Sequence, residues 1–64
     1  MDYETAIKQA VNYSKTQQKE TSIYRATFPG QYEWSPIASL LTDPKNILMM
    51  VDARGEMHPI NAEE

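Results

Sequence analysis

The feature that most constrains this chain is an unbroken run of five apolar residues, Ile47–Val51, followed by a tight-turn sequence that ends in Gly55. An apolar run of this length bounded by turn residues is typical of a buried strand that enters a hairpin. Because side chains alternate along a strand, both faces of this strand are apolar and both need cover. A chain of 64 residues has little core to spare, so few arrangements meet that requirement.

The residues after this run predict the second half of the hairpin. Asp52 and Gly55 match the first and last positions of a type I turn whose glycine adopts the left-handed conformation. A return strand is expected over 56–60, and Pro59 places it at an edge because proline has no N–H to donate to a further strand. The strand 47–51 is therefore expected to be central, and the last residues, 61–64, are expected to form a mobile tail.

The N-terminal quarter has the spacing of an amphipathic helix over 3–18. Its apolar side chains recur every three or four residues and fall on one arc, opposite a face that carries lysines. Asp2 is the expected N-cap, because its carboxylate can accept the free N–H groups of the first turn. This helix is expected to cover one face of the central strand.

A strand with period-two alternation is predicted over 22–28. Pro29 and Gly30 then suit the two central positions of a type II turn, where proline presets φ and glycine supplies a positive φ. The next residues, 31–34, also alternate, and we interpret them as an extended lead-in to the following helix.

A short helix is predicted over 36–42. Ser35 is a preferred N-cap residue, and Pro36 is favoured at the first helical position, where no N–H is needed. Pro44 ends the helix, because the residue before a proline is pushed out of the α region. The apolar stripe that this helix is expected to turn towards the core consists of Ile37, Leu40 and Leu41.

These elements predict a single small α+β domain over 1–64, with the order α-β-α-β-β. The N-terminal helix packs on a three-stranded sheet, and the linker 29–46 is long enough for a crossover, so the first two strands can run parallel in a mixed sheet. The second face of the central strand is left either to the short helix or to a second copy of the chain. The sequence leaves both alternatives open.

Composition narrows the classes of function. The chain has no cysteine and a net charge of −3, which excludes a disulfide framework and disfavours a dedicated nucleic-acid binder. It shows no leader-like segment and no long apolar span, so we expect a cytoplasmic protein without a membrane segment. Short acidic chains of this kind are typical of bacterial or phage accessory proteins.

No spacing typical of a catalytic or cofactor site is present. His58 is the only histidine, and with Asp52 and Glu56 it suggests at most an incomplete metal site or acid–base pair, since zinc sites generally take three or four protein ligands. We interpret His58 as a solvated side chain on an edge strand. The sequence therefore predicts a non-enzymatic protein with no metal, no cofactor and no small-molecule ligand.

Two groups of residues are candidates for partner binding. Tyr32 and Trp34 alternate on one face, and aromatic residues often anchor interfaces, although Trp34 can equally close the core. Lys8, Lys15 and Lys19 share the polar face of the first helix, for which the alternative is an ordinary solvated face. We expect a protein-interaction module that forms a homodimer or binds a partner protein. The alternative is a nucleic-acid-associated regulator that uses the lysine face.

Overall fold

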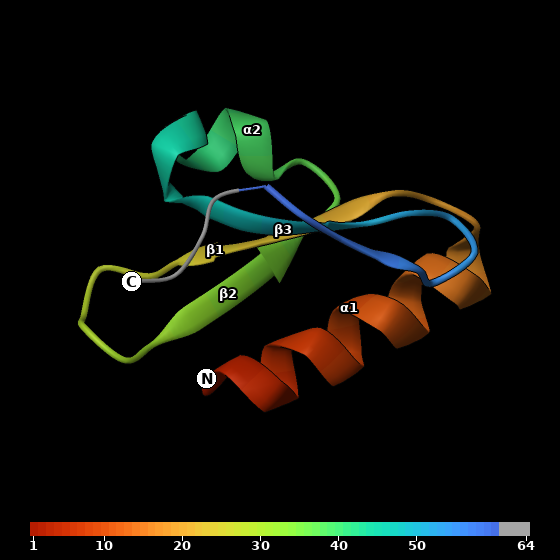
Figure 1. The fold of residues 1–64 in the computed structure, drawn as a ribbon, viewed down its shortest axis with the longest axis horizontal. Helices are drawn as coiled ribbons and strands as arrows, with labels where there is room; N and C mark the ends of the chain where they lie inside the picture. Colours follow the sequence, from red (N-terminus) through yellow and green to blue (C-terminus); the bar gives the residue numbers. More distant parts are fainter. Residues whose placement is uncertain (61–64) are drawn as a thin grey trace.

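The computed structural model describes residues 1–60 and shows a four-stranded antiparallel sheet with a helix on each side (Figure 1). The sheet has the order β2-β1-β3-β4. The elements are α1 (Tyr3–Gln17), β1 (Thr21–Arg25), β2 (Tyr32–Ser35), α2 (Ala38–Leu41), a 3₁₀ turn (Pro44–Asn46), β3 (Ile47–Val51) and β4 (Met57–Pro59). The predicted α+β class is confirmed, with one strand more than expected. The tail predicted at 61–64 lies outside the described residues.

Helix α1 begins and ends where side-chain and backbone caps are available. The Asp2 carboxylate accepts the Thr5 N–H at 2.8 Å, which confirms the predicted N-cap, and hydrogen bonding to Thr5 lowers the pKa of Asp2. At the other end Gln18 adopts a left-handed conformation with φ 55°, and its N–H donates to the carbonyl of Ser14. The predicted helix therefore ends one residue earlier than expected.

The main core lies between α1 and the sheet. Ala6 and Ala10 present a smooth, fully buried face of the helix to Ile23 of β1 and Val51 of β3. Small residues on this face let the helix backbone approach the strands closely. The partly buried apolar residues packed around this cluster are Tyr3, Ile7, Val11, Tyr32, Trp34 and Met49.

The expected parallel pairing of the first two strands is wrong, and so is the interpretation of 31–34 as a lead-in. Gly30 has φ 79° and the Gln31 N–H donates to Phe28 O at 3.1 Å, so the chain turns back at once and forms strand β2 against β1. Both β2 and β3 are antiparallel to β1. The crossover therefore exists, but it runs through α2 and joins β2 to β3, which lie on either side of β1.

Helix α2 begins two residues later than predicted and turns its apolar stripe outwards. Ser35 ends β2 and its Oγ accepts the Ile37 N–H at 3.0 Å, so Ser35 precedes the helix without capping its first turn. Ala38 is the residue of α2 that is buried. The expectation that Ile37, Leu40 and Leu41 pack on the core is wrong, because a single turn has one inward position and Ala38 occupies it.

Strand β3 is internal and β4 is at the edge, as predicted. The Ile60 N–H donates to Leu48 O, and the Asp52 N–H donates to Glu56 O. Because the backbone groups of successive residues point alternately towards and away from the neighbouring strand, Pro59 N faces away from β3. On the face opposite α1, Leu48 is buried but Met50 is only half-buried. Among residues 1–60, helix α2 thus packs over one end of that face (Figure 1).

The β3–β4 turn contains a glycine whose replacement is expected to destabilise the fold. Gly55 has φ 88°, and a Cβ placed on it would lie 2.6 Å from Lys15 Cε and 2.8 Å from Lys15 Cγ. We expect Gly55→Ala to lower the free energy of unfolding by about 1–2 kcal/mol for the left-handed backbone, with an added cost for displacing Lys15. Urea unfolding monitored by circular dichroism measures the loss.

The matched control for this substitution is Gly30→Ala. Gly30 also has a positive φ, 79°, but a Cβ there meets nothing within 4 Å, so this variant reports the backbone cost alone. Equal losses for the two variants would show that Lys15 moves aside without cost and contributes nothing at this contact.

Candidate functional site

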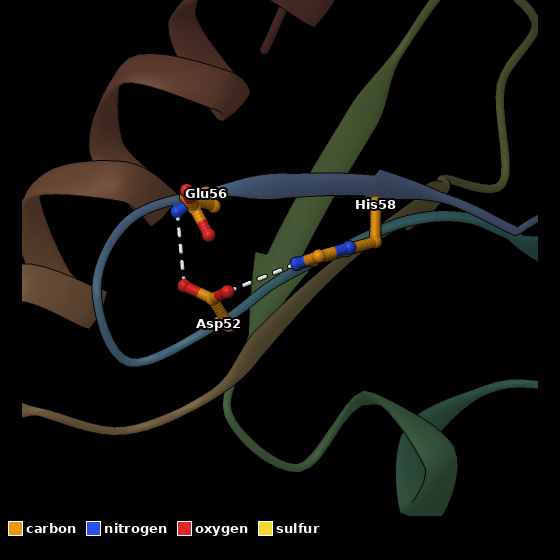
Figure 2. A group of neighbouring side chains, drawn as sticks. All are labelled: Asp52, Glu56 and His58. Atoms are coloured by element: carbon orange, nitrogen blue, oxygen red, sulfur yellow. Dashed lines mark hydrogen bonds and ion pairs between the residues drawn. The ribbon is translucent and has the colours of Figure 1, made fainter.

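The β3–β4 hairpin brings three ionisable side chains together, those of Asp52, Glu56 and His58 (Figure 2). Asp52 and Glu56 lie opposite each other across the turn, and His58 lies two residues further along β4 on the same face. One ligand-type atom from each residue lies within 4.8 Å of the others. The shared face of Glu56 and His58, inferred from the sequence, is thus confirmed.

Every oxygen of the Asp52 carboxylate has a partner. Oδ1 accepts the backbone N–H of Arg54 at 2.9 Å and that of Glu56 at 3.0 Å. Oδ2 lies 2.9 Å from His58 Nε2, and because an ionised carboxylate only accepts hydrogen bonds, His58 is the donor. The hydrogen bond from His58, followed by that from Glu56, lowers the pKa of Asp52 to about 2.

These hydrogen bonds join the two strands of the hairpin at its turn, and we call the cluster of Asp52, Glu56 and His58 the hairpin clasp. A metal ion could be held by Asp52 Oδ2, His58 Nε2 and the Glu56 carboxylate, but it would have to replace the Asp52–His58 hydrogen bond. It would also meet a cation already in place, since the Arg54 guanidinium lies 3.0 Å from Glu56 Oε2. The prediction that these residues form no metal site stays a prediction. The contacts themselves show hydrogen bonds and an ion pair among the side chains and backbone of the turn.

The clasp is expected to make stability depend on acid pH. The folded-state pKa of Asp52 is about 2, below its ordinary value of 3.8, so the unfolded chain takes up its proton first as pH falls. The stabilisation is complete above about pH 5 and is lost between there and pH 2. In thermal unfolding scans from pH 6 to pH 2, we expect Asp52→Asn to flatten part of this slope. The control is Glu20→Gln, which removes an exposed acid outside both the clasp and the α2 surface and should leave the slope unchanged. Equal effects of the two substitutions would show that the clasp does not cause the pH dependence.

Tyr32 and Trp34, predicted to bind a partner, both point towards α1 and are half-buried. The ring of Tyr32 contacts Tyr3 edge-on with centroids 5.0 Å apart, and the indole of Trp34 lies 5.2 Å from the ring of Tyr13. Trp34 Nε1 also donates to Gln9 Oε1 at 2.9 Å. The indole therefore closes one edge of the core and at the same time forms the wall of a surface cleft of about 260 Å³.

The three candidate lysines are exposed on or next to α1, and the structure does not group them with the aromatic pair. The stem of Lys15 lies against Gly55 of the hairpin turn, so part of this side chain is used in packing. Lys8 and Lys19 lie towards opposite ends of α1, with Lys19 beyond its C-cap. The lysine face thus resembles an ordinary solvated helix face, and its role in partner binding stays a prediction.

The surface that sequence reasoning missed is the outward stripe of α2. Ile37 is 50%, Leu40 79% and Leu41 56% exposed, and we call these three residues the α2 surface. Their spacing, i, i+3 and i+4, is that of one helix face and is the sequence signal for this surface. The same spacing also fits a stripe that faces the core. On the same side of the sheet lies Ile60, 54% exposed, opposite the buried Leu48.

Comparison of the chain with known protein families, curated proteins and solved structures finds no match. Within residues 1–60, none of the helices has the length and apolar character needed to cross a bilayer.

Proposed function

We propose that this protein is a non-enzymatic interaction module that self-associates through the α2 surface. The observation that carries the proposal is the exposure of three large aliphatic side chains: Ile37, the residue that precedes the single-turn helix α2, and Leu40 and Leu41 on the helix itself. Contiguous apolar side chains at the surface of a small protein are unusual and mark interaction sites. We also propose a cytoplasmic location, which the absence of cysteine favours.

The partner that fits this surface best is a second copy of the chain. Asp43 and Lys45 are both exposed just after α2, so the apolar stripe is flanked by one charge of each sign. In a two-fold arrangement the same patch is used by both copies, and each Lys45 can then face the Asp43 of the partner copy. The half-buried Met50, on the face of the sheet that α2 packs against, would be buried further by the same contact.

Association through the strand edges is less well supported. Strand β4 has only three residues and carries Pro59, and part of the β2 edge is already paired with Met1. Short edges of this kind resist strand-to-strand pairing of whole sheets. The α2 surface is small beside the roughly 800 Å² per partner that stable interfaces bury, so we expect a reversible dimer.

The test is the oligomeric state as a function of concentration. Sedimentation equilibrium of the unmodified chain should show a monomer–dimer equilibrium, and Leu40→Lys should raise the dissociation constant at least about tenfold, which corresponds to 1.4 kcal/mol. Leu40 is 79% exposed, so the substitution should leave the circular dichroism spectrum unchanged.

The matched control is Phe28→Lys. Phe28 is equally exposed, at 72%, but lies in the β1–β2 turn away from α2. The Phe28→Lys substitution should leave the dissociation constant of the dimer unchanged. A chain that stays monomeric at all concentrations, or one whose association responds equally to both substitutions, would refute the α2 surface as the contact.

A further inference from the structure

The outer edge of β2 has one open backbone position. The Ala26 N–H donates to Gln31 O, and alternation along the antiparallel pair then turns Glu33 and Ser35 towards β1 and turns Tyr32 and Trp34 outwards. The outward position at Tyr32 is occupied by Met1, whose carbonyl accepts the Tyr32 N–H at 2.7 Å and whose nitrogen donates to Tyr32 O at 3.2 Å. Among residues 1–60, the backbone N–H and C=O of Trp34 have no protein partner.

The exchange of both hydrogen bonds between Met1 and Tyr32 is the pattern of a hydrogen-bonded antiparallel pair. The chain therefore already adds one residue of a further strand to this edge. The next position of the same kind is Trp34, and Pro36 closes the edge beyond it because it has no N–H. The open stretch is thus long enough for a short extended segment and too short for a whole strand of another sheet.

A cleft lies beside the open position, between α1 and β2. Its volume is about 260 Å³, and it is lined by Gln9, Asn12, Tyr13, Thr16, Gln17 and Trp34. None of these side chains is charged. The indole is fixed at the wall by its hydrogen bond to Gln9 and by the ring of Tyr13, so the cleft combines rigid aromatic surface with amide and hydroxyl groups.

We propose that the edge of β2 binds an extended, uncharged peptide segment that pairs with Trp34. The peptide continues the line that Met1 begins, runs antiparallel to β2, and exchanges two backbone hydrogen bonds with Trp34. Residues paired across antiparallel strands point to the same face, and Trp34 points towards α1. The peptide residue opposite Trp34 therefore places its side chain in the cleft, where an aliphatic group contacts Tyr13 and the indole.

This site is separate from the α2 surface, so it stands independently of self-association. The two surfaces lie on different elements, and α1 and α2 lie on opposite faces of the sheet (Figure 1). Binding at β2 can therefore be measured in the Leu40→Lys variant, and failure at one surface leaves the other unaffected.

The experiment uses the tripeptide Thr-Thr-Ile, acetylated at its N-terminus and amidated at its C-terminus, titrated into the ¹⁵N-labelled protein. With the isoleucine opposite Trp34, this peptide ends before the position that Met1 occupies opposite Tyr32. We expect saturable shifts of the Trp34 backbone amide and of its indole N–H, while the signals of α2 stay in place. The first control peptide carries an N-methyl group on the isoleucine, which removes the N–H that donates to Trp34 O. We expect this control to bind at least about tenfold more weakly. A second control peptide has glutamate in place of isoleucine. It should bind no better than the N-methylated peptide, because none of the side chains that line the cleft is a cation.

Three results would overturn the proposal. One is the absence of any shift up to the solubility limit of the isoleucine peptide. Another is unchanged affinity for the N-methylated peptide, which would show that backbone pairing plays no part. The third is a set of shifts confined to α2, which would place the peptide on the other apolar surface.

Discussion

Replacing Ile23 with alanine is expected to lower the free energy of unfolding by about 3–4 kcal/mol. Ile23 is fully buried and belongs to the cluster formed with Ala6 and Ala10 of α1 and Val51 of β3. The helix side of this cluster is built from alanines, whose side chains cannot reorient to fill the space. The cost therefore includes the lost burial of the side chain and most of the cavity that it leaves.

The effect of Ile23→Ala is large because the whole domain is small. A core in a chain of this length rarely supplies more than about 3–5 kcal/mol, so the variant should be mostly unfolded without a stabilising osmolyte. Urea unfolding in trimethylamine N-oxide, monitored by far-ultraviolet circular dichroism, recovers a measurable transition for both proteins. The protein concentration is held constant, because any dimerisation adds to the apparent stability.

The matched control is Ile60→Ala, which removes the same atoms from a side chain that is 54% exposed and lies outside the α2 surface. We expect a change of less than about 1 kcal/mol, since surface substitutions away from special contacts have small effects. If Ile23→Ala costs no more than Ile60→Ala, the α1–sheet cluster is not the core that stabilises this fold.

The parts of the fold that follow from local chemistry could be predicted from the sequence. Asp2 caps α1, Gly55 completes the hairpin turn, and Pro59 lies at the edge, and each is fixed by the chemistry of one residue. The central position of Ile47–Val51 could also be predicted, because only an internal strand can bury apolar side chains on both faces.

The sequence predicts the wrong arrangement where two local structures fit the same residues equally well and only tertiary packing decides between them. The alternation in 31–34 fits a lead-in as well as a strand, and only its pairing with β1 makes it β2. The stripe Ile37, Leu40, Leu41 fits an inward or an outward helix face, and the burial of the small Ala38 decides for outward. Neither decision leaves a mark in the periodicity of the sequence.

The candidate sites at the hairpin clasp and at the β2 edge also depend on tertiary structure that the sequence does not reveal. The sequence placed Glu56 and His58 on one face, but the role of Asp52 depends on a turn that directs its carboxylate at two backbone amides. The aromatic rings of Tyr32 and Trp34 make them candidates in the sequence, whereas the open backbone position at Trp34 follows from the register of β1 and β2. Register is a property of the pairing, so a single strand does not reveal it.

The second large effect is expected at the buried hydroxyl pair of Ser14 and Thr21. Both side chains are buried, their oxygens lie 2.8 Å apart, and Thr21 Oγ1 also donates to Ala10 O at 3.5 Å, which ties the last turns of α1 to the start of β1. Thr21→Val keeps the shape and removes the hydroxyl, so the Ser14 hydroxyl loses its partner. We expect this variant to lose about 1–3 kcal/mol of unfolding free energy in urea titrations.

The double variant Ser14→Ala with Thr21→Val separates hydrogen bonding from packing. Removing both hydroxyls leaves no unsatisfied polar group, so we expect the double variant to be more stable than Thr21→Val alone, with a coupling of about 1 kcal/mol. If Thr21→Val alone is neutral, the Ser14 hydroxyl has turned to the Ala10 carbonyl one helical turn before it, and the link between α1 and β1 then rests on apolar packing alone.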